Sequence, residues 1–101
     1  MGSRLELQEV LEGILGSDEV YFQPPESVKM SYPAIVYNLS FIQTRYANDG
    51  VYEQHREYLV TVVDRDPDSD ILNKISRLPH CRFSRHYTAD NLNHYVFALH
   101  Y

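Results

Sequence analysis

Apolar and polar residues follow a strand pattern most clearly at residues 58–63, in the middle of the stretch 52–66. The Val, Thr and Tyr side chains of this run fit a pleated sheet surface, whereas in a helix they crowd the preceding turn. The run therefore predicts a strand. We expect the elements on either side of it to pair with it or to cover it.

A second alternating pattern follows Pro33 and runs from Ala34 to about Arg45. Its predicted core-facing row consists of Ile35, Tyr37, Leu39 and Phe41. Asp49-Gly50 lies between the two strand patterns, and because Gly adopts positive φ at little cost, a hairpin is predicted there. The first half of the returning strand is polar, so we expect this hairpin to project from the body.

Two helices are predicted from apolar residues at helical spacing. The first covers Arg4–Leu15 and buries Leu7, Val10, Leu11, Ile14 and Leu15. Gly16 follows where a left-handed residue often ends a helix. The second has Asp66 as its expected N-cap and Pro67 at its first position, and Pro79 is expected to end it. Its apolar stripe consists of Ile71, Leu72, Ile75 and Leu78.

Two further strands are predicted, from Arg82 to Tyr87 and from Asn93 to Tyr101, and Val20–Phe22 fits a short additional strand. The expected order is α-β-β-α-β-β. This order predicts an α+β fold in which a mostly antiparallel four-stranded sheet carries two helices on one face. A chain of 101 residues is long enough for one domain with one modest core.

Composition narrows the class of protein. Hydrophobic residues make up 44% of the chain and charged residues 23%, which are values of an ordinary globular protein. The net charge of −5 gives no general electrostatic attraction for nucleic acid. Arg82 and Arg85 could form a local basic patch, although two arginines on a strand are more often solvated surface. The nine tyrosines suit half-buried sheet faces and subunit contacts.

Localisation signals are few. Cys81 is the single cysteine, so an intramolecular disulfide is excluded and a reducing compartment is expected. No apolar run approaches the ~20 residues that span a bilayer, and we expect no membrane partner. The opening residues lack the charged and apolar regions of a signal peptide.

The five histidines raise the question of a metal site. His80 and Cys81 are neighbours on a strand and point to opposite faces. His94 and His100 are expected about 20 Å apart, too far to share an ion. His86 and His94 could meet across a hairpin, but a third ligand is lacking. We therefore expect no metal.

Two other patterns could carry chemistry. Residues 64–70 hold four carboxylates but lack the glycine and the closing glutamate of a calcium loop, so a helix-capping turn is expected. Cys81 follows a predicted helix C-terminus, whose dipole disfavours a thiolate. We expect no catalytic residues and no cofactor.

Several segments, taken in order, carry a resemblance to a known family. After the N-terminal amphipathic helix come Tyr32-Pro33-Ala34-Ile35-Val36-Tyr37 and then Tyr58-Leu59-Val60-Thr61-Val62-Val63-Asp64. Asp66-Pro67-Asp68-Ser69, a short helix and the turn Arg85-His86-Tyr87-Thr88-Ala89-Asp90 follow. This pattern resembles the small tail-completion proteins of tailed bacteriophages and prophages, the tail terminator group with its related head-tail joining proteins. The likeness extends from about Leu5 to Tyr101.

The resemblance implies a non-enzymatic virion protein without a cofactor. Such a protein forms a ring, typically of six subunits, that caps the head-proximal end of the tail tube and stops its polymerisation. Its partners are further copies of itself, the major tail tube protein and the head connector protein, while DNA passes through without specific binding. The expected location is the virion tail or neck, and the host cytoplasm during assembly. An acidic pore lining would ease the passage of DNA, because like charges repel.

The projecting hairpin is the expected subunit contact, since a heterologous interface that closes on itself makes a ring. The candidate contact residues are Tyr46, Tyr52, His55 and Arg56. Alternatives stay open at this point. The chain could be a stopper or adaptor in the head-tail connector or neck, a small His/Cys metal-binding enzyme, or a free-standing regulatory or binding domain.

Overall fold

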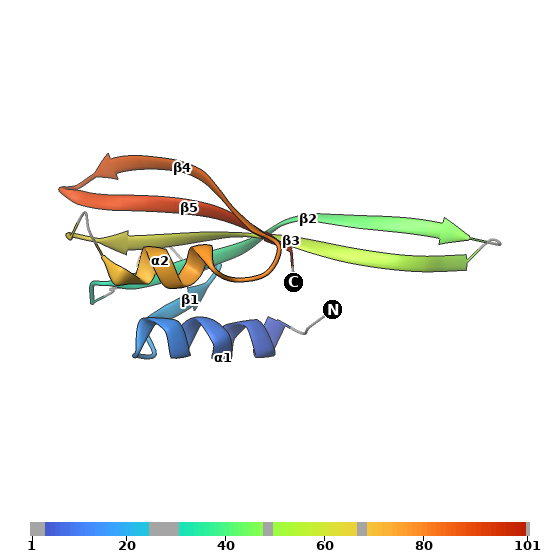
Figure 1. The fold of residues 1–101 in the computed structure, drawn as a ribbon, viewed down its shortest axis with the longest axis horizontal. Coiled ribbons are helices and arrows are strands. Elements are labelled where there is room, and N and C mark those ends of the chain that lie inside the picture. Colours follow the sequence, from blue (N-terminus) through green and yellow to red (C-terminus); the bar gives the residue numbers. More distant parts are fainter. Residues whose placement is uncertain (1–3, 25–30, 48–49, 67–68, 101) are drawn as a thin grey trace.

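The computed structural model describes residues 4–24, 31–47, 50–66 and 69–100 (Figure 1). Its elements, in chain order, are α1 (Arg4–Leu15), β1 (Val20–Phe22), β2 (Ala34–Ala47), β3 (Gly50–Asp64), α2 (Asp70–Ser76), β4 (Cys81–Ala89) and β5 (Leu92–His100). The strands form one sheet in the order β1-β2-β3-β5-β4. The α+β class is confirmed.

The sheet differs from the predicted one in number and direction of strands. It has five strands instead of four, because Val20–Phe22 joins as an edge strand. β1 runs parallel to β2, with Val20 beside Ile35 and Phe22 beside Tyr37, while every other neighbouring pair is antiparallel. The sheet is therefore mixed.

The core lies between the helices and one face of the sheet. The register places Tyr37, Val60 and Phe97 side by side across β2, β3 and β5. α1 contributes Leu7 and Leu11 to this cluster, and α2 contributes Ile75. The buried members of the core are Leu7, Leu11, Val20, Ile35, Tyr37, Tyr58, Val60, Val62, Ile75, Tyr95, Phe97 and Leu99. Both helices therefore cover the same face of the sheet, as predicted.

The predicted core row of β2 is wrong at Phe41, whereas Leu39 faces the predicted side without being buried. Leu39 pairs with Tyr58 and Phe41 pairs with Glu57, so Ser40 is an extra residue in the ladder. Because successive residues of β3 point to opposite faces, this β-bulge moves Phe41 to the face opposite Leu39. Leu39 and Phe41 are 37% and 51% exposed, and neither belongs to the core.

The predictions for the two helices are partly confirmed. α1 has the expected bounds, and Gly16 follows it with a φ of 80°. Val10, however, is 37% exposed, so it lies outside the stripe that faces the sheet. α2 begins later than predicted, because the hydroxyl of Ser69, and not Asp66, caps it by accepting a hydrogen bond from the Ile71 amide. Pro67 lies outside the described residues.

The C-terminal hairpin is tighter than predicted. β4 extends one residue before and two residues beyond the expected strand, and β5 starts at Leu92. Asp90 and Asn91 form a two-residue turn, and both have positive φ, as a type I′ turn requires. Tyr101 lies outside the described residues.

The helix-free face of the sheet is also partly buried. Val96 and Ala98, which point away from the helices, are 3% and 1% exposed. Val96 lies between Thr61 and Arg85 in the register, and Ala98 lies between Leu59 and Arg82. Since small side chains sit here between larger ones, a sheet face without a helix can still exclude water.

A buried tyrosine connects α1 to the sheet. The Tyr37 hydroxyl donates to Gln8 Oε1 (2.5 Å) and accepts from Arg4 Nη1 (3.4 Å). Gln8 Nε2 also donates to the Val20 carbonyl oxygen (3.0 Å), and the Arg4 guanidinium lies 4.7 Å from the Phe22 ring centroid. Burial raises the pKa of Tyr37 above its ordinary value, although the Arg4 contact acts in the opposite direction.

Replacement of Tyr37 by Phe tests this connection. We expect the free energy of unfolding at pH 7 to fall by about 1 kcal/mol, because one buried hydrogen-bonding group is lost. This difference in the free energy of unfolding between wild type and variant should shrink above pH 10. Because the pKa of Tyr37 is raised in the folded state, its hydroxyl contributes stability that is fully present at pH values below the unfolded-state pKa. Wild type loses this contribution as pH rises through the folded-state pKa, whereas the Phe variant has no such group to titrate. Urea unfolding across pH 7–11 measures both effects.

Tyr87→Phe is the matched control, because Tyr87 is 43% exposed and should lose much less stability. Equal losses in the two variants would show that the Tyr37 hydroxyl does not hold α1 on the sheet.

Candidate interface: the projecting hairpin and its base

A two-stranded ribbon extends from the five-stranded part of the sheet (Figure 1). β5 pairs with β3 only from Glu57 to Asp64, whereas β2 and β3 pair as far as Ala47 and Gly50. Residues 41–47 and 50–56 therefore lie beyond the other strands, and we call them the arm. The arm explains the elongated shape of the molecule, whose extents are 51 × 28 × 23 Å.

The predicted hairpin and its projection are thus observed. The turn residue Asp49 lies outside the described residues. The Ser40 bulge marks the base of the arm, and a second irregularity lies between Arg45 and Tyr46. Bulges increase the local twist of a strand pair, so they turn the ribbon relative to the sheet from which it extends.

The arm presents apolar side chains near its base. Phe41 is 51% exposed and Ile42 is 43% exposed. They pair with Glu57 and Arg56 respectively, so they lie on opposite faces of the ribbon. Within the part of the chain that the structure describes, neither arm strand has a second neighbouring strand. A two-stranded ribbon is only marginally stable in water, and exposed strand edges invite pairing with another chain.

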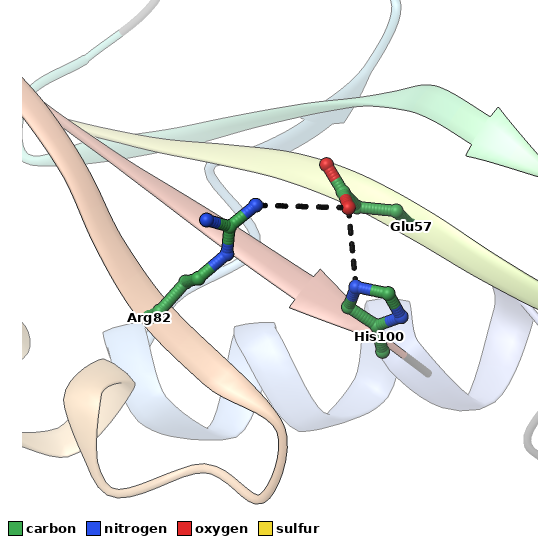
Figure 2. Close-up of polar contacts among 3 residues, drawn as sticks. All are labelled: Glu57, Arg82 and His100. Carbon is green, nitrogen blue, oxygen red and sulfur yellow. Dashed lines mark ion pairs between the residues drawn. The ribbon is translucent and has the colours of Figure 1, made fainter.

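Three polar side chains meet where the arm leaves the sheet (Figure 2). Glu57 Oε2 lies 3.1 Å from His100 Nε2 and 4.0 Å from Arg82 Nη2. The three residues come from β3, β5 and β4. The Glu57 side chain is 16% exposed, whereas that of Arg82 is 73% exposed, so the Arg82 contact is solvent-screened. The His100 amide also donates to the His80 carbonyl oxygen (3.1 Å).

This cluster was not predicted from the sequence. Glu57 and His100 are directly opposite in the β3–β5 ladder. The alternation pattern shows which residues share a face of one strand, but it does not determine which residue of another strand lies opposite. A correct register for β3 and β5 would have identified the pair.

All four candidate contact residues lie on the arm strands. Arg56 pairs with Ile42 and is exposed. His55 pairs with Gln43, and Tyr46 pairs with Val51, while Tyr52 falls at the second irregularity. The side chains of Tyr46, Tyr52 and His55 lie outside the described residues. The structure therefore places these residues on the arm but does not test their contacts.

The histidines whose side chains the structure describes do not converge. His86 stacks on Tyr95 at 4.5 Å between ring centroids, and His94 stacks on Tyr87 at 4.7 Å. Because Tyr95 faces the helices and His94 faces the other side, the expectation that His86 and His94 could meet is wrong. The two-residue turn fixes this register. Among the described residues, no three His, Cys, Asp or Glu side chains are close enough to hold an ion.

The acidic segment before α2 acts locally. Asp64 is 8% exposed, and its carboxylate oxygen Oδ1 accepts from the Asp66 amide (3.0 Å). A surface hollow near it is lined by Ser31, Tyr32, Asp64 and Arg65. Asp68 lies outside the described residues. Ser69, and not a described carboxylate of this segment, caps α2, so the expected capping by the acidic residues is not observed in the described part of the segment.

Comparisons with known proteins add no assignment. No protein-family model matches the chain, and a search of curated proteins finds no match. Within the described residues, neither helix is long and apolar enough to cross a bilayer.

The reactivity of the Cys81 thiol tests the alternative that the chain is a small His/Cys enzyme. Burial raises the pKa of its thiol, so less thiolate is present near neutral pH. We expect the native protein to react with a disulfide reagent such as DTNB at pH 7.5 about tenfold more slowly than the urea-unfolded protein. Free cysteine in the same urea concentration is the control. A native thiol that reacts faster than free cysteine would indicate an activated nucleophile.

Proposed function

We propose that this chain is a non-enzymatic structural protein of a tailed phage or prophage. In this proposal it caps the head-proximal end of the tail tube as a ring of identical subunits and joins the tube to the head connector. The order of elements and the segments around Tyr32, Tyr58 and Tyr87 support the proposal through their resemblance to tail terminator proteins. No cofactor and no catalytic residue is assigned to the chain.

The observation that supports this function best is the arm. It extends beyond the strands that would stabilise it, and it exposes Phe41 and Ile42. Its outer edges offer backbone N–H and C=O groups to another chain. These properties suit a segment that is completed by a neighbouring subunit, and exposed apolar surface of this kind often marks a protein contact.

A ring follows from the asymmetry of such a contact. The arm of one subunit would touch a different surface on the next subunit, and a heterologous contact of this type closes into a ring when its rotation allows. The net charge of −5 per subunit suits a ring through which DNA moves, because like charges repel and retention by the protein is weak.

The arm contact is tested by the double variant Tyr46→Ala, Tyr52→Ala. We expect it to raise the midpoint concentration of ring assembly by about tenfold or more, because interface tyrosines often contribute strongly to binding. Sedimentation velocity across a concentration series measures the midpoint. Negative-stain electron microscopy of the wild-type assembly should show rings with a central channel.

The matched control is Thr44→Ala, Gln54→Ala, which changes two paired residues of the same ribbon. It should assemble like wild type. If the tyrosine variant formed rings at the wild-type concentration, the arm tyrosines would not be the subunit contact. Assemblies without a channel would contradict the capping ring itself.

A further inference from the structure

Charged residues are distributed unevenly along the chain. Residues 4–24 contain five acidic residues and one basic residue. Residues 71–89 contain four of the chain's nine basic residues and none of its 14 acidic residues. The four basic residues, which are Lys74, Arg77, Arg82 and Arg85, are all exposed. The molecule therefore has a negative segment and a positive segment, although its net charge is negative.

α1 and β4 lie on opposite sides of the molecule, whereas Lys74 and Arg77 belong to α2 and its C-cap, which pack beside α1. α1 packs against β1 and β2, which lie at one end of the strand order. β4 is the edge strand at the other end. In Figure 1, α1 runs along the lower side of the body and β4 along the upper side. A single copy cannot bring these surfaces together, but two copies can.

Each surface also carries exposed apolar side chains among its charges. On the outward side of α1, which we call the acidic edge, Leu5 is 65% exposed and Val10 is 37% exposed, close to Glu6 and Glu9. Apolar contact area surrounded by charged residues is the usual composition of a protein interface.

On β4, which we call the basic edge, Tyr87 is 43% exposed and shares the helix-free face of the sheet with Arg82 and Arg85, whereas Phe83, which is 57% exposed, lies on the helix side. The Phe83 ring rests on Phe97 at 5.5 Å, and the Arg85 guanidinium lies 5.7 Å from the Tyr87 ring centroid. These contacts hold the aromatic rings in place on the strand.

We infer that the acidic edge of one copy docks on the basic edge of the next copy. Opposite charges attract the two edges and set their orientation, while the exposed Leu5, Val10 and Tyr87 side chains supply the apolar contact. The contact is head-to-tail, so each copy uses one edge toward each neighbour. This inference rests on the proposed ring, but it uses surfaces of the body that are separate from the arm.

The dimensions of the edges agree with this docking. α1 has 12 residues and is about 18 Å long, and β4 has nine residues and is about 30 Å long. Glu9 and Arg85 lie near the middle of their elements, so the docking brings these two charges close together. β4 is interrupted by a register shift between Phe83 and Arg85, which makes continuous pairing with a foreign strand difficult. A helix face is therefore a better partner for β4 than another strand.

Charge reversal tests the contact. Glu9→Lys and Arg85→Glu each put like charges together, and we expect each to raise the assembly midpoint by about tenfold or more at 50 mM NaCl. The combined variant Glu9→Lys, Arg85→Glu should return to within about threefold of wild type, because the pair is restored with reversed signs. An equimolar mixture of the two single variants should also recover assembly, since each variant then finds a complementary neighbour.

Sedimentation velocity measures all four samples, and circular dichroism checks that each is folded. Arg65→Glu, the same charge change at an exposed residue off both edges, is the control and should assemble like wild type. Wild-type assembly should weaken at 500 mM NaCl, because salt screens the charges.

The outcomes separate this inference from the proposed function. If the single variants formed wild-type rings, or if neither the combined variant nor the mixture recovered, the edge contact would be excluded while the capping ring would stand. A wild-type protein that stayed monomeric up to about 1 mM at low salt would overturn the edge contact and remove the free ring as well.

Discussion

The pairing of β3 with β2 on one side and β5 on the other is the interaction on which the rest of the structure depends. β3 is the middle strand of the sheet, and its Val60 and Val62 are fully buried beneath the helices. α1 and α2 are short, and helices of this length need tertiary packing to be stable. Both find that packing on the surface that β3 and its neighbours form.

β3 also explains why the arm extends beyond β5. β5 ends at His100, opposite Glu57, while β2 continues beside β3 for the length of the arm. Within its described residues, the chain thus combines a body that buries its own core with a ribbon of two strands. Since the acidic and basic edges lie on opposite sides of that body, the structure has an asymmetric set of surfaces, which is what a head-to-tail assembly of identical subunits requires.

Sequence reasoning predicted the features that depend on local periodicity. The bounds of α1, the central strand and the projecting hairpin follow from spacing of apolar residues and from a glycine turn. Sequence reasoning failed where the face or the neighbour of a residue depends on pairing between strands. An alternating pattern cannot reveal an extra residue in a strand. It therefore missed the Ser40 bulge, which places Phe41 on the other face. The relation between His86 and His94 depends on the turn at Asp90 and Asn91, which sets the register of the hairpin.

The candidate interface also has one part that the sequence predicts and another part that it does not predict. The arm could be predicted because its residues are consecutive, and all four candidate contact residues lie on it. The cluster of Glu57, Arg82 and His100 could not, because it joins three strands whose order and register are set by the whole sheet. The two charged edges were missed for a related reason. Arg82 and Arg85 look like ordinary solvated residues until β4 is known to be an edge strand opposite α1.

Hydrogen-deuterium exchange of the free and assembled protein tests most directly whether neighbouring subunits complete the arm. The account predicts that amides of residues 41–47 and 50–56 gain protection when the protein assembles, whereas amides of β3 between Glu57 and Asp64 are already protected in the free subunit. Equal exchange of the arm amides in both states would contradict the account.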